Sequence, residues 1–185
     1  MSRQGRDTSA WQRLIRDKRG AAAVEMALCL PIFGYMGLNL MDYGIYTFAQ
    51  TQTEIAAEMA VGAARNLCNS SALLPATGAS AKCGANLTSQ MTAAAQGTSL
   101  GTSVKISSPA EGYYCANTGG TLVSVAAINA APPATCAQVV AGSTSAPGDY
   151  INVTASYTYV PFAPGMTIAS LLPGTIQQTS WMRLL

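Results

Sequence analysis

A long, mainly apolar run from Ala21 to Met41 is the feature that most constrains how this chain can fold. In a helix that rises about 1.5 Å per residue, the run is roughly 30 Å long, which matches the hydrocarbon thickness of a bilayer. The short polar sequence Asp17-Lys18-Arg19-Gly20 precedes it directly. The run therefore predicts a membrane-spanning helix that begins close to the N-terminus.

One carboxylate, Glu25, lies inside this run. An ionised carboxylate in a bilayer costs at least a few kcal/mol, and no basic residue lies within one helical turn to neutralise it. Either Glu25 is protonated in lipid, or a positive partner comes from elsewhere. Cleavage after Gly20 would supply such a partner, because the new amino group at Ala21 would lie about one turn from the Glu25 of a neighbouring copy. Gly20 and Ala21 therefore form a candidate cleavage site, and Glu25 is a candidate residue for assembly and register.

The order of these features resembles a known protein family. A basic leader, Gly20, a glutamate five residues later and a long apolar helix are similar to a type IV prepilin signal. More closely, RGAAAVEMALCLPIFG followed by GIYTFAQTQTEIAAEMAVGAAR, within residues 17–66, resembles the TadE-like minor pilins or pseudopilins of the Tad (Flp) pilus system. The C-terminal sequence, from VTASYTYVPFAPG to SWMRLL, also resembles TadE-like proteins.

This resemblance implies a minor pilin or pseudopilin that is cut after Gly20 by a prepilin peptidase and used in Tad/Flp pilus assembly. The implied partners are the bacterial inner membrane, the peptidase and other pilin or pilus-assembly subunits. Met26 stands where the major Flp pilins usually carry tyrosine, which favours the minor relative over the filament subunit. The alternative interpretation is an uncleaved single-pass envelope protein whose outer domain binds a partner or a surface ligand.

Charge is distributed unevenly along the chain. Residues 1–20 hold six Lys/Arg against two Asp, whereas residues 21–185 hold four basic residues against six acidic ones. Under the positive-inside rule, residues 1–20 are predicted to be a cytoplasmic leader. The residues after Met41 are then periplasmic, or extracellular in an assembled pilus. A nucleic-acid partner is not predicted, because no basic or aromatic surface accompanies the leader.

The helix is expected to continue beyond the span of residues 21–41 as an amphipathic extension over residues 42–66. No proline falls between Pro31 and Pro75, and a stripe recurs at three- and four-residue spacing. This stripe packs either on the chain's own outer domain or, in its upper part, on neighbouring subunits. Its members, which we call the predicted stripe, are Ile45, Phe48, Gln52, Ile55, Met59 and Ala63.

Two residues inside the span affect its packing. Pro31 removes one helical hydrogen bond and predicts a kink. The alternative is that it is simply a tolerated transmembrane proline. Cys29 is most simply a small apolar packing residue.

Residues 67–185 read as a loop-rich outer domain with four cysteines on the side that faces an oxidising compartment. Four cysteines allow three connectivities, of which short loops favour Cys68 with Cys83 and Cys115 with Cys136. Each bridge would contribute on the order of 3 kcal/mol. A metal site is disfavoured, because the sequence has no CxxC pair and no histidine.

Strand patterns are clearest near the C-terminus. Residues 150–160 alternate between apolar and polar, and residues 175–184 predict an antiparallel partner. The apolar face of the first strand carries Ile151, Val153, Ala155, Tyr157 and Tyr159. Weaker strand candidates are residues 101–107 and 120–127, and a short helix is expected at residues 86–96.

The predicted fold class is therefore α+β and pilin-like. A long N-terminal transmembrane and amphipathic helix is joined to a small, disulfide-stapled antiparallel β-sheet domain, which is laid against the outer half of the helix.

The sequence offers little for catalysis. It has no histidine, which excludes Ser-His and Cys-His nucleophile pairs, and its acidic residues outside the anchor show no recognisable spacing. We predict neither an enzyme nor a cofactor. The outer tyrosines either pack in the sheet or form an adhesive or carbohydrate-binding surface; they are Tyr113, Tyr114, Tyr150, Tyr157 and Tyr159.

Overall fold

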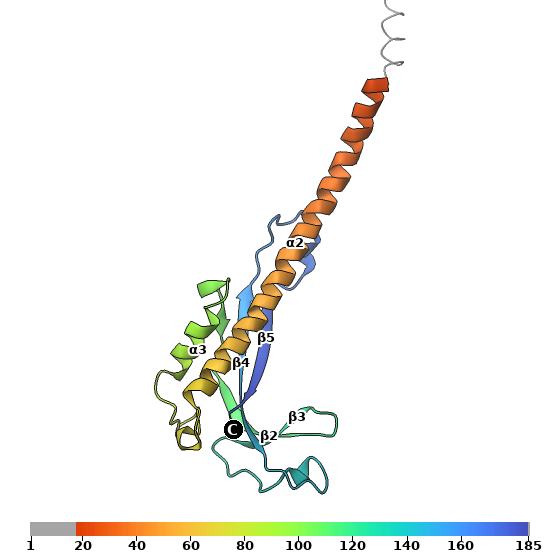
Figure 1. The fold of residues 1–185 in the computed structure, drawn as a ribbon. Helices are drawn as coiled ribbons and strands as arrows, with labels where there is room; N and C mark the ends of the chain where they lie inside the picture. Colours follow the sequence, from red (N-terminus) through yellow and green to blue (C-terminus); the bar gives the residue numbers. More distant parts are fainter. Residues whose placement is uncertain (1–17, 185) are drawn as a thin grey trace, which may run out of the picture. The chain divides into compact units, whose positions relative to one another are not determined.

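The computed structural model describes residues 18–184, so most of the predicted leader lies outside the described residues. The first described element is a single long helix, α2, from Lys18 to Leu67 (Figure 1). Its helical structure continues through Pro31. The long N-terminal helix that the sequence predicts is thus confirmed.

Two compact units share α2, and each is described by itself. The first unit comprises Met1–Gly44 and Pro161–Leu171, of which residues 18–44 and 161–171 are described. The second comprises Ile45–Val160 and Leu172–Leu185. The division of α2 falls close to Met41, where the sequence predicts that the membrane span ends.

The second unit contains a five-stranded antiparallel sheet. Its central strand, β4 (Gly148–Thr158), pairs with β1 (Lys105–Ile106), β2 (Ala110–Ala116) and β5 (Thr175–Arg183), while β3 (Leu122–Ala127) pairs with β2. The predicted strands at residues 150–160 and 175–184 correspond to β4 and β5, and their antiparallel pairing is confirmed.

The remaining elements match the weaker sequence patterns to different degrees. The helix expected at residues 86–96 is α3, Leu87–Ala95. The candidate at residues 101–107 yields only the two-residue β1 after a 3₁₀ turn, and the candidate at 120–127 is β3. Strand β2 was not predicted, because AEGYYCA lacks apolar alternation and contains a glycine, Gly112.

The core of the second unit lies between the sheet, α3 and a face of α2 that carries small side chains (Figure 1). Ile151, Val153 and Ala155 of β4 are fully buried, as their alternation predicts. From α3, Leu87 and Met91 join the same cluster. The residues that contribute from α2 and directly after it, here called the small-residue face, are Ala56, Ala57, Ala60, Val61 and Ala64, followed by Cys68.

Of the two alternatives for the predicted stripe, packing on the chain's own outer domain is wrong for its large apolar members, and packing on neighbouring subunits stays a prediction. Ile45, Phe48, Ile55 and Met59 are each between 37% and 54% exposed, whereas the small-residue face is fully buried. Alanine allows the helix backbone to approach the sheet closely and to pack densely against it. Both faces recur at helical spacing, so the period alone does not distinguish them.

Two disulfides close loops in the second unit. They join Cys68 to Cys83 and Cys115 to Cys136, the two pairs that loop length favours. The first ties the residue after α2 to the segment before α3. The second ties β2 to a 3₁₀ turn at Cys136–Gln138.

Candidate processing and assembly site

The predicted cleavage site lies in the first described turns of α2. Gly20 is exposed, and a side chain at its position would meet nothing within 4 Å. The side chain of Ala21 lies outside the description. Glu25 follows Ala21 by four residues, which is about 6 Å along the helix and places both on one face. The helix therefore places these two residues about one turn apart, while the cleavage itself stays a prediction.

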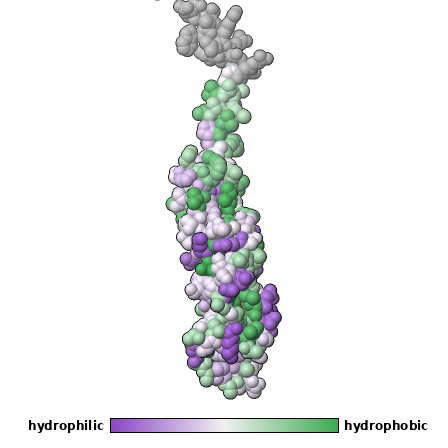
Figure 2. Space-filling view, turned by 90° about the vertical axis from the view of Figure 1, so that its left-hand side faces the viewer, coloured by the Kyte–Doolittle hydropathy of each residue, from purple (hydrophilic) through white to green (hydrophobic). Residues whose placement is uncertain are grey.

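Around Glu25, the helix carries apolar side chains on all sides. Val24, Met26 and Leu28 are each at least 60% exposed, and the side chains of Ile32 and Phe33 are exposed to a similar degree. In Figure 2 the helical stretch next to the grey residues is mostly green, the colour of hydrophobic residues. A helix that is apolar all round requires a lipid or protein environment.

Membrane anchoring follows from these properties of α2. Among the residues that the structure describes, one helix is long and apolar enough to cross a bilayer, within Ala22–Leu67. Its apolar end is near the N-terminus and is not buried by the rest of the chain. We conclude that α2 anchors the protein in a membrane.

Pro31 and Cys29 both lie on the exposed part of α2. Cys29 has no disulfide partner and is exposed, so it does not pack against the described part of this chain. Its predicted packing role would need lipid or another subunit. The kink expected at Pro31 stays a prediction.

The outer half of α2 adds a second candidate surface. Within the predicted stripe, Gln52 is half-buried, and its Oε1 accepts a hydrogen bond of 2.9 Å from the Ser99 hydroxyl. The apolar members Phe48 and Ile55 stay exposed. An exposed apolar line on a helix is typical of an interaction surface.

Sequence reasoning missed one polar cluster, formed by Glu111 on β2 and Asp149 on β4. Glu111 Oε1 accepts from the backbone N–H of Ala76 at 2.9 Å, and Oε2 accepts from the Thr77 hydroxyl at 2.8 Å. Asp149 is 94% buried, since its exposed fraction is 6%. No spacing rule links these residues, because the β2–β4 pairing brings them together.

The electrostatics of this cluster are unusual. The pKa of Asp149 is raised to about 7, chiefly by burial and also by the neighbouring Glu111 carboxylate. The pKa of the Tyr113 phenol is also raised, by burial first and then by Asp149 and Glu111. Glu111 holds the loop at residues 76–77 against the sheet, so we interpret the cluster as structural.

Three of the outer tyrosines pack against other aromatic rings. Tyr114 packs edge to face against Tyr150 and Trp181, with ring centroids 6.0 and 5.1 Å apart. Tyr159 is buried and packs edge to face on Tyr46 of α2. These tyrosines serve sheet packing.

The fold and site define a helix-anchored α+β membrane protein with a disulfide-stapled sheet. A protein-family model described as "TadE-like protein" matches residues 20–61. Over these residues the chain is similar to TadE-like proteins, as its sequence motifs indicate, and this similarity is consistent with a component of the Tad pilus system. The match begins at Gly20 and covers most of α2. Comparison with curated proteins and with solved structures gives no match.

Proposed function

We propose that this protein is a minor pilin or pseudopilin of a Tad/Flp-type pilus. It is inserted with residues 1–20 in the cytoplasm, cut after Gly20 by a prepilin peptidase, and used as a structural subunit in pilus assembly. Residues 21–41 span the inner membrane, residues 42–66 extend the helix, and residues 67–185 form the periplasmic domain. Its role is structural and not enzymatic.

The observation that carries this proposal is the family match over residues 20–61, which starts at the proposed cleavage residue. A glutamate inside an apolar helix is costly in lipid unless a cation meets it. Cleavage provides that cation as the amino group of Ala21. In an assembly of parallel helices, the amino group of one copy can neutralise Glu25 of the next and so set the axial register.

The exposed side of α2 supports the same proposal. The apolar side chains of residues 22–37 need a new environment when the helix leaves the bilayer, and packing against other subunits provides one. The exposed members of the predicted stripe, Ile45, Phe48, Ile55 and Met59, extend this surface beyond the membrane.

Replacement of Glu25 tests the proposal directly. Glu25→Ala should leave membrane insertion and the amount of protein unchanged but remove the subunit from the pilus fraction, or stop piliation, in cells that carry the matching assembly genes. The matched control is Glu54→Ala, which removes an exposed carboxylate further along the same helix. Unchanged assembly in Glu25→Ala would contradict the pairing and favour an uncleaved single-pass envelope protein.

A further inference from the structure

One segment of the first unit is bound to α2 near the predicted end of the membrane span. We call residues 161–171 the latch loop. The backbone N–H of Phe162 donates to Asp42 Oδ1 at 3.0 Å, and the Thr167 hydroxyl donates to Asp42 Oδ2. The backbone N–H of Ile168 donates to Asn39 Oδ1 at 2.8 Å. Because Asn39 and Asp42 are three residues apart, the latch loop lies along one side of the helix.

These hydrogen bonds give the polar groups at the junction partners within the chain. Asp42 is fully buried and Thr167 is 5% exposed, so neither presents a charge or a hydroxyl at the surface. Backbone groups of the latch loop are also paired internally, with the Met166 N–H donating to the Ala163 carbonyl at 3.1 Å. Each such bond lowers the cost of placing the segment in an environment poor in water.

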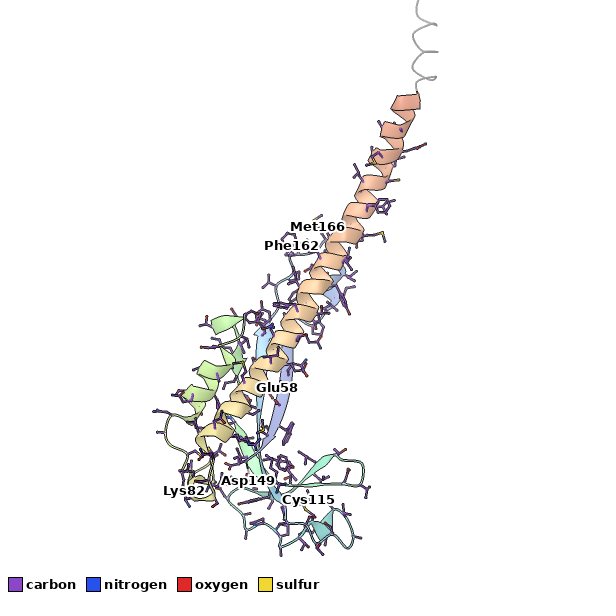
Figure 3. The ribbon with its side chains drawn as sticks, viewed as in Figure 1. Glu58, Lys82, Cys115, Asp149, Phe162 and Met166 are labelled. Carbon is purple, nitrogen blue, oxygen red and sulfur yellow. A yellow bond between two sulfur atoms is a disulfide. The ribbon has the colours of Figure 1, made fainter. Side chains whose placement is uncertain are left out.

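In contrast, the latch loop exposes its large apolar side chains. Phe162 is 61% exposed, Met166 62% and Leu171 84%. Figure 3 labels Phe162 and Met166 on this segment. From Tyr150 to Met182 the sequence contains no charged residue at all. Soluble surfaces rarely leave a patch of this kind bare, so it marks a contact with lipid or protein.

A shallow apolar groove connects the latch loop with the helix. Its volume is about 470 Å³, and its lining is apolar or aromatic apart from one amide. Tyrosines are enriched where proteins meet the membrane–water boundary. The lining residues are Tyr35, Met36, Asn39, Leu40, Tyr43 and Ile168.

We propose that the latch loop inserts into the bilayer leaflet that α2 leaves near Met41, with Phe162, Met166 and Leu171 among the upper acyl chains. The apolar surface of the membrane-spanning helix runs directly into the groove and the latch loop, and the hydrogen bonds at Asn39 and Asp42 fix that junction at the end of the span. The absence of charge on the loop suits lipid. The proposal depends on the membrane anchor and not on pilus assembly.

Depth-dependent fluorescence quenching tests this proposal in the full-length chain. A Cys29→Ser background removes the free thiol, and Met166→Cys provides a single site for a polarity-sensitive nitrobenzoxadiazole label. The protein is reconstituted in vesicles of phosphatidylethanolamine and phosphatidylglycerol that include a lipid with a doxyl quencher high on its acyl chain. We expect several-fold stronger quenching at this site than at the matched control, Val123→Cys on β3, which is 38% exposed in the second unit.

Equal quenching at the two sites would overturn the proposal. If quenching is weak but oxidation links two copies through Met166→Cys, a second copy covers the latch loop and the lipid assignment is wrong. Phe162→Cys replaces Met166→Cys if that variant does not fold. The vesicles contain no pilus proteins and no peptidase, so a failed pilus proposal and a failed lipid proposal give distinguishable results.

Discussion

The two sides of the outer half of α2 differ in side-chain size, and the smaller side is the buried one. Ala57 and Ala60 are fully covered by the second unit, whereas Phe48 and Met59 are 54% and 41% exposed. Dense packing depends on how closely two surfaces fit, so small side chains that admit a sheet can be better core residues than large ones. The large side chains are thereby left available for partners outside the chain.

The largest loss of stability is expected when the disulfide between Cys68 and Cys83, at the end of the small-residue face, is removed. Cys68→Ser combined with Cys83→Ser opens a loop of 15 residues and should lower the free energy of unfolding by about 3 kcal/mol. Chemical unfolding of the full chain in detergent, followed by Trp181 fluorescence, measures it. Cys29→Ser, which removes an exposed free thiol, is the control and should change nothing. A stability loss as large in the control would contradict the account.

A larger side chain should destabilise the buried face of α2 but not the exposed face, so such substitutions compare the two faces most directly. Ala60→Leu adds bulk at a fully buried position and should cost about 2 kcal/mol of unfolding free energy. Met59→Leu introduces the same residue at the neighbouring, exposed position and should stay within about 0.5 kcal/mol of the parent. The same unfolding assay compares them. Equal costs would mean that the small-residue face is not packed as described.

The stability of the second unit, whose sheet covers the small-residue face, should depend on pH through Asp149. Its pKa is raised to about 7, so the folded state retains a proton that the unfolded state has lost above about pH 4. Stability should therefore fall as pH rises, by on the order of 2 kcal/mol between about pH 5 and about pH 8. Asp149→Asn should flatten this slope, whereas the exposed Glu54→Gln should not.

Glu111 and Tyr113, both on β2, are the titratable groups that interact with Asp149, and Arg183 lies opposite the next residue, Tyr150, on the neighbouring strand. A slope of the opposite sign in the parent protein, or one that Asp149→Asn leaves unaltered, would show that Asp149 is ionised in the folded state at neutral pH.

The exposed face should contribute least to stability and most to assembly. Phe48→Ser and Ile55→Ser are expected to change the unfolding free energy by no more than about 0.5 kcal/mol, since both side chains already meet solvent. Under the proposed function they should nevertheless reduce recovery of the protein with sheared pili. Lys82→Ser, an exposed change away from α2, is the control. If both variants are recovered with pili at the normal level, the predicted stripe is not part of the assembly surface.

Local patterns in the sequence predicted several features well. The apolar run predicts α2, the alternation after Tyr150 predicts β4, and short cysteine spacing favours the two disulfide pairs that the structure contains. Each of these signals is contained within a few turns or one strand of the chain, where periodicity and loop length act directly.

Other features depend on contacts between distant segments, and the sequence does not reveal them. Glu111 meets residues 76–77 only after β2 has joined the sheet, and Asp42 meets Thr167 across more than a hundred residues. The choice between two helical faces of equal period likewise depends on the shape of the sheet. Hydrophobic size was the wrong guide at that point, because close approach of the backbone decided which face is buried.

The most direct test of the central claim is the amino-terminal mass of the protein recovered from membranes of cells that carry the matching assembly genes. We expect a mature chain that begins at Ala21, produced by cleavage after Gly20. A protein that retains Met1 would contradict prepilin processing and leave a single-pass membrane protein with an unexplained carboxylate at Glu25.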